Sequence, residues 1–171
     1  MRNLLLLVVA VVAFAQTPSP RFEDFPAPTE WAGPAVAPKL TTRAERLYRT
    51  RLMNAAKESP NFAGHYRFVE WGCGSECVSG AIVDLSTGRV IAPPLAESST
   101  AVLHFSVCQS AYEGSGAEVR LDSRLMIVRC GLNYDQRLDR NVPDVYFFVL
   151  DDKGFRKLAQ LHGKDAARLQ K

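Results

Sequence analysis

Short apolar runs separated by turn residues fill the chain beyond Gly64, and this pattern restricts the fold more than any other feature of the sequence. Runs of this length are typical of β-strands, and tight turns between them favour antiparallel hairpins. The run at 145–150 is apolar throughout, as expected of a central strand covered on both faces. The candidate strands are residues 65–71, 78–85, 89–92, 102–107, 117–121, 125–130, 145–150 and 155–161.

One helix is predicted before the strands. Thr42 and Glu45 have the spacing of a capping box, in which each side chain accepts a hydrogen bond from a backbone amide of the first turn. Apolar residues then recur at helical spacing, and Pro60 disfavours helical backbone at the residue before it. We therefore expect a helix over 42–58 with its cationic side chains on a solvated face. The fold class follows as α+β, with a single, mostly antiparallel, strongly twisted sheet of about 6–8 strands and one N-terminal helix packed on a face.

The N-terminus has the pattern of a Sec-type signal peptide. Arg2 precedes twelve apolar residues at 4–15. That run is shorter than the roughly 20 residues needed to cross a membrane, and it ends in the small residues that signal peptidase requires at Ala13 and Ala15. We expect cleavage after Ala15, periplasmic or secreted localisation, and a soluble mature chain with no membrane partner after cleavage.

The remaining chain divides into two parts by composition. Six prolines fall within 16–39, which predicts an extended arm because proline lacks a backbone donor and fixes φ. Phe22, Phe25 and Trp31 either pin this arm to the domain or contact a partner. Residues 40–171 are expected to form a single α+β globular domain. Without the leader, 20 basic and 18 acidic residues leave a formal charge of +2, which argues against a nucleic-acid partner.

Four cysteines in an exported chain predict disulfide bonds. Of the three possible pairings we favour Cys73–Cys77 with Cys108–Cys130, because the first pair brackets the turn of a predicted hairpin. The three histidines are not spaced as zinc ligands, so we predict no metal and no cofactor. Calcium is also not expected, since the oxygen-bearing side chains near the end of the chain lack the spacing of a calcium loop. These are Asp135, Asp139, Asn141 and Asp144.

The most distinctive polar group surrounds the first hairpin. Alternation places His65 and Trp71 on one strand face and Tyr66 and Phe68 on the other. If the helix covers the face of Tyr66 and Phe68, then His65, Trp71 and the loop residue Glu76 form an exposed binding surface. The alternative is that Trp71 packs in a second part of the core.

The chain resembles an uncharacterised group of exported bacterial proteins in two neighbouring segments. These are Asn61-Phe62-Ala63-Gly64-His65-Tyr66 and Trp71-Gly72-Cys73-Gly74-Ser75-Glu76-Cys77. The resemblance implies export and a shared fold unit. It implies no catalytic residue.

Two functions fit the sequence. The first is a small exported binding module, of the kind that inhibits or sequesters another extracytoplasmic protein or holds a small ligand, and it agrees with the lack of any catalytic signature. The second is a small exported hydrolase in which Glu70 or Glu76 acts with His65. A concave site holding two titratable groups would favour the enzyme, and a flat or protruding surface would favour binding. The sequence leaves the oligomeric state open.

Overall fold

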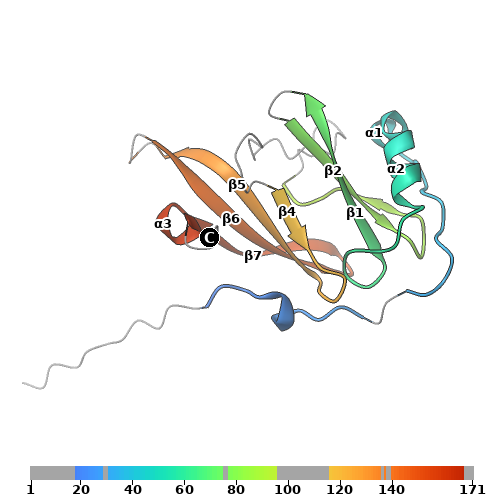
Figure 1. The fold of residues 1–171 in the computed structure, drawn as a ribbon, viewed down its shortest axis with the longest axis horizontal. Coiled ribbons are helices and arrows are strands. Elements are labelled where there is room, and N and C mark those ends of the chain that lie inside the picture. Colours follow the sequence, from blue (N-terminus) through green and yellow to red (C-terminus); the bar gives the residue numbers. More distant parts are fainter. Residues whose placement is uncertain are drawn as a thin grey trace, which may run out of the picture.

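The computed structural model describes residues 18–28, 31–74, 77–95, 116–135, 137 and 140–167. These residues form two β-sheets stacked face to face, with helices against the outer face of one sheet and the N-terminal arm and a short helix against the outer face of the other (Figure 1). The predicted signal peptide and the candidate strand at 102–107 lie outside the described residues.

The strands form two separate antiparallel sheets. The first has the order β1 (Tyr66–Gly74), β2 (Cys77–Asp84) and β3 (Val90–Ile91). The second has the order β4 (Gly116–Val119), β5 (Leu125–Asp135), β6 (Arg140–Asp151) and β7 (Gly154–His162). The predicted single sheet of about 6–8 strands is therefore wrong. Each strand pairs with its neighbour in the chain, but in the described part no ladder joins the two sheets, and β3 ends the first sheet after two residues.

Side chains from both sheets meet in the main core. Phe68 of β1 and Ile82 of β2 face Met126 of β5 and Phe148 of β6, and all four are buried. The residues between them on each strand point to the outer faces, because successive side chains in a strand alternate. The run at 145–150 within β6 is buried throughout because both faces of the strand are covered there.

The predicted helix at 42–58 is two short helices, α1 (Arg43–Leu47) and α2 (Arg49–Ala55). They are separated by Tyr48, whose φ of −96° and ψ of 19° are not helical. The predicted capping box is present, with the Glu45 amide donating to Thr42 Oγ1 at 3.1 Å and the Thr42 amide donating to Glu45 Oε2 at 2.8 Å. No helix among the described residues is long and apolar enough to cross a membrane.

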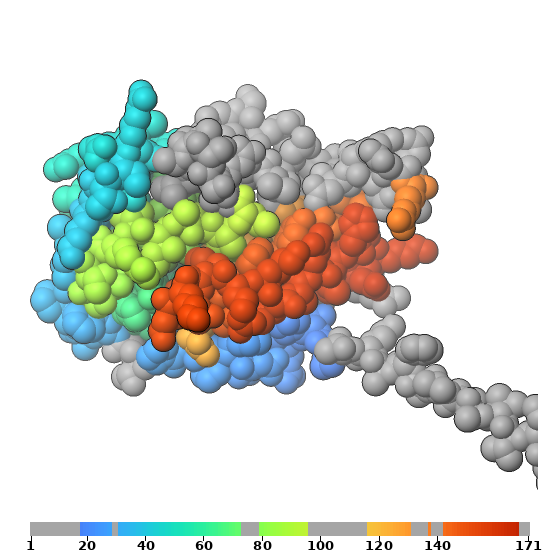
Figure 2. Space-filling model, turned by 180° about the vertical axis from the view of Figure 1, so that it is seen from behind, coloured from blue at the N-terminus to red at the C-terminus, as the bar shows by residue number. Residues whose placement is uncertain are grey.

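The arm lies along the second sheet and then passes to the first (Figures 1 and 2). Phe22, in the 3₁₀ helix η1 (Phe22–Asp24), and Phe25 pack against the outer face of the second sheet, beside α3 (Lys164–Ala167). Backbone hydrogen bonds hold the arm to the β4–β5 turn, since the Ala27 amide donates to the Asp122 carbonyl and the Arg124 amide donates to the Phe25 carbonyl, both at 2.9 Å.

Candidate functional site

Trp71 belongs to the core. It is 7 % exposed, and its ring centroid lies 4.9 Å from that of Tyr48 at the junction of the two helices. Leu52 of α2 and Val83 of β2 belong to the same cluster. The helices thus cover the face of β1 that carries Trp71, opposite to the face of Tyr66 and Phe68. The binding surface predicted from the sequence consisted of His65, Trp71 and Glu76. Trp71 is buried in the core, and Glu76 lies outside the described residues.

His65 lies in the turn directly before β1. Its Nε2 is 3.8 Å from Asp84 Oδ1, and its ring packs against that of Tyr66 with 4.1 Å between centroids and 33° between the ring planes. The Asp84 carboxylate accepts hydrogen bonds from the hydroxyls of Ser86 and Thr87, both at 2.6 Å. Burial raises the pKa of Asp84, but the donors of Ser86 and Thr87 and the nearby His65 outweigh it, so the pKa lies below its ordinary value. Asp84 is therefore an ionised turn residue.

Glu70 and His65 are not brought together. Glu70 lies five residues further along, roughly 16 Å at the rise of an extended strand. Its carboxylate lies near β4, where the Ala117 amide donates a hydrogen bond to it. The Glu70 side chain is solvent-accessible, yet surrounding protein atoms partly desolvate the carboxylate and raise its pKa, while the Ala117 amide acts in the opposite direction.

A concave site does form beside His65, where the arm crosses the ends of both sheets. This pocket, called the arm pocket below, has a volume of about 430 Å³. Its walls come from the arm, the turn before β1, the β4–β5 turn and the β6–β7 turn. The lining residues are Pro26, Ala27, Pro28, Ala63, His65, Tyr66, Arg124, Leu150, Asp151 and Asp152.

The acidic side of the arm pocket is the β6–β7 turn. Asp151 Oδ2 lies 3.7 Å from Arg156 Nε, an exposed pair. Asp152 is exposed and forms no ion pair with any described residue. Burial raises the pKa of the Tyr66 phenol, the carboxylates of Asp84 and Asp152 raise it further, and Arg89 lowers it. Asp152 and Tyr66 thus both line the arm pocket.

Arg124 is the basic residue of the arm pocket, and backbone groups hold it. Its Nε donates to the Pro26 carbonyl at 3.2 Å, and a terminal nitrogen donates to the Leu150 carbonyl at 3.5 Å. The guanidinium thus joins the arm to the end of β6. This leaves the carboxylates of Asp151 and Asp152 as the less constrained charges in the lining.

Sequence reasoning did not single out Tyr66, Arg124, Asp151 or Asp152 as site residues. The two aspartates were interpreted only as turn residues, because Asp-Asp-Lys-Gly between two apolar runs is a turn signal. Their position beside the arm depends on tertiary contacts. No local pattern in the sequence carries that information.

A second polar cluster lies at the other end of β6. The buried Asp144 accepts from the Tyr146 hydroxyl at 3.1 Å, and its Oδ1 lies 2.5 Å from His162 Nδ1. Asp144 was one of the four oxygen-bearing residues considered above as calcium ligands. In the structure its carboxylate contacts Tyr146 and His162. Among the described residues no group of three or more histidine, cysteine or acidic side chains is placed to hold a metal ion.

The cysteines are only partly described. Cys130 of β5 is fully buried and is not a free thiol. Cys77 pairs with Gly74 across the β1–β2 hairpin, next to Cys73 at a shift in register. Cys108 lies outside the described residues, so both pairings stay predictions.

No protein-family model matches this chain, and no curated protein or solved structure is significantly similar to it. The geometry of the described residues is therefore the basis for the function proposed below.

Proposed function

We propose that this chain is an exported binding module that holds a positively charged group in the arm pocket. The group is a protonated amine or a guanidinium on an apolar stem. It would belong either to a basic side chain of another extracytoplasmic protein or to a small free amine. The observation that carries the proposal is that the exposed Asp152, the partly exposed Asp151 and the ring of Tyr66 line one concave site.

The chemistry of the lining suits such a ligand. Carboxylates attract a cation directly, and an aromatic ring attracts it through the negative charge of its face. The rings of Tyr66 and His65, with 4.1 Å between their centroids, line the same pocket as these carboxylates. Pro26, Pro28 and Leu150 offer apolar contacts for the stem of a lysine or arginine side chain. A volume of about 430 Å³ is within the usual range for ligand sites.

The hydrolase alternative has less support. A concave site with titratable groups is what we expected of an enzyme, but of the expected acid–base residues it contains only His65. Glu70 is absent from the lining, and Glu76 lies outside the described residues. The carboxylate beside His65 is Asp84, which the Ser86 and Thr87 hydroxyls hold as part of a turn. Proton transfer needs a group free to accept the proton at hydrogen-bond distance.

Calorimetric titration tests the proposal. The probes are Nα-acetyl-lysine methylamide, Nα-acetyl-arginine methylamide and n-butylamine, with Nα-acetyl-norleucine methylamide as the uncharged match. We expect the cationic probes to bind and the norleucine probe not to bind. Tighter binding of the amino-acid amides than of n-butylamine would identify a protein side chain as the ligand, and the reverse would identify a free amine.

Asp152→Asn should weaken binding of the lysine probe by about fivefold, because it removes the exposed carboxylate while keeping the shape of the side chain. Glu118→Gln is the matched control, since Glu118 lies on β4 in an exposed pair with Arg129 outside the pocket. Equal affinity for the norleucine and lysine probes, or unchanged affinity in Asp152→Asn, would contradict the proposal.

A further inference from the structure

The outer face of α1 and α2 carries a concentration of unpaired positive charge. Arg43, Arg46, Arg49 and Arg51 are all exposed. The only acidic residue of the two helices is Glu45, which is buried and accepts the capping hydrogen bonds of Thr42. These four arginines therefore have no exposed acidic neighbour on their own helices.

Five arginines of the arm and sheets differ in this respect. Arg21, Arg67, Arg120, Arg129 and Arg156 each form an ion pair with a carboxylate. Within the part of the chain that the structure describes, none of the four helix arginines does. Arg46 donates only to the carbonyls of Leu40 and Thr41.

An apolar side chain lies among these charges. Leu47 is 73 % exposed, more than Trp31 at 39 % or Val36 at 38 %. Residues four apart on one helix are neighbours on its surface, so Arg43 lies beside Leu47 on α1, and Arg49 and Arg51 follow on α2 after the break at Tyr48. Burying Leu47 in the protein core is not possible here, because the opposite side of the helices already packs on the first sheet.

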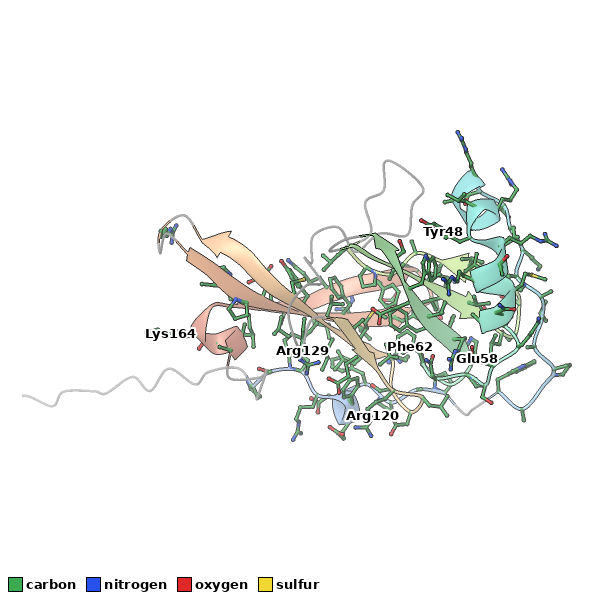
Figure 3. The ribbon with its side chains drawn as sticks, turned by 45° about the horizontal axis from the view of Figure 1, so that its top comes forward. Tyr48, Glu58, Phe62, Arg120, Arg129 and Lys164 are labelled. Carbon is green, nitrogen blue, oxygen red and sulfur yellow. The ribbon has the colours of Figure 1, made fainter. Side chains whose placement is uncertain are left out.

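The two helices form an outer layer at one end of the molecule (Figures 2 and 3). Several side chains with nitrogen at their tips extend from α1 and α2 away from the sheets (Figure 3). Leu52 and Ala55 anchor the inner side against Trp71 and Val83. The basic face is therefore presented outward on a layer fixed to the first sheet.

We infer that this face, formed by Arg43, Arg46, Leu47, Arg49 and Arg51, docks on the surface of an anionic phospholipid bilayer. Basic side chains are attracted to anionic headgroups, and an apolar residue between them can enter the headgroup region. A nucleic acid would satisfy the arginines but would offer no comparable site for Leu47. The contact is peripheral and needs no membrane-spanning segment. It is separate from the arm pocket and does not depend on the proposed function.

Co-sedimentation with vesicles tests this inference on the mature chain. We expect binding to vesicles of phosphatidylglycerol and phosphatidylcholine at low salt, weaker binding at high salt, and little binding to phosphatidylcholine alone. The double variant Arg43→Gln/Arg51→Gln should weaken binding to the anionic vesicles by about 25-fold, because the loss of each arginine should weaken it by about fivefold. Leu47→Gln should also weaken it while leaving the charge unchanged.

The matched control is Arg21→Gln/Arg129→Gln, which removes the same charge from the arm and the second sheet. It should bind the anionic vesicles within about twofold of the unmodified protein. All variants should keep the melting temperature of the parent, because the substituted helix side chains are exposed. Equal loss of binding in both double variants would overturn the inference. So would equal binding to both kinds of vesicle, or binding to heparin without binding to anionic vesicles.

Discussion

Replacement of Trp71 by alanine tests most clearly whether this side chain packs in the core or lies on the surface. Its side chain is 7 % exposed and packs against Tyr48 and the helices. An aromatic side chain buries about 150–250 Å², which at about 25 cal/mol per Å² corresponds to roughly 4–6 kcal/mol. Substitutions of buried tryptophan by alanine cost about 3–5 kcal/mol, so we expect Trp71→Ala to lose that much stability. For a domain of this size the melting temperature should fall by about 6–20 °C.

Urea unfolding followed by circular dichroism measures this loss. Trp71→Phe should lose less than half as much, because it keeps a ring against Tyr48 and removes an indole N–H that is buried without a hydrogen-bond partner. Trp31→Ala is the control, since Trp31 is 39 % exposed and should change stability by less than about 1 kcal/mol. A loss below about 1 kcal/mol in Trp71→Ala would refute the core placement.

Three further predictions concern the arm, the pH dependence and the cysteines. Ser123→Ala should cost about 1–3 kcal/mol and expose the arm to proteases, because the buried Ser123 hydroxyl joins the Phe22 and Phe25 carbonyls; thermal unfolding and limited proteolysis check this. The lowered pKa of Asp84 means that its stabilising contribution is present above the unfolded pKa and is lost as pH falls through the folded pKa. Asp84→Asn should therefore be less stable than the parent at neutral pH, and the difference should shrink below about pH 4 in acid melts. Mass mapping without reduction should give a chain that starts at Gln16 with Cys73–Cys77 and Cys108–Cys130 bonds, and a Cys77–Cys130 bond would contradict the pairing.

The hairpins could be predicted because their signals are local. Alternation and turn residues identified the pairs that became β1–β2, β4–β5 and β6–β7. The number of sheets could not be predicted in the same way. Whether two hairpins join edge to edge or stack depends on contacts between distant residues, such as Phe68 against Met126. The apolar run in β6 indicated two covered faces but not which elements cover them.

For the helix, too, local features could be predicted from the sequence and its packing could not. The capping box at Thr42 was predicted correctly because it lies within four residues. The break at Tyr48 was missed, since apolar spacing continues through it. Alternation correctly separated Trp71 from Tyr66 and Phe68, but it could not decide which face the helices cover. In the structure the helices cover the face that carries Trp71, which is therefore buried.

The arm pocket could not be predicted from the sequence for a further reason. Its lining comes from residues 26–28, 63–66, 124 and 150–152, which only the complete fold brings together. The arm contains the 3₁₀ helix η1 before Phe25, and nothing local indicated that Pro26 pairs with the turn at Ser123. His65 was singled out because it lies on the predicted strand 65–71. It lines the pocket because the arm crosses the fold beside it.

Amide chemical shifts during a titration with Nα-acetyl-lysine methylamide test the binding claim most directly. The measurement uses the ¹⁵N-labelled mature chain and maps every perturbed backbone amide. The account predicts saturable shifts for amides at 63–66 and 150–152, no shifts across α1 and α2, and loss of the effect in Asp152→Asn. A saturable response confined to residues outside the arm pocket, or no response at millimolar probe, would contradict it.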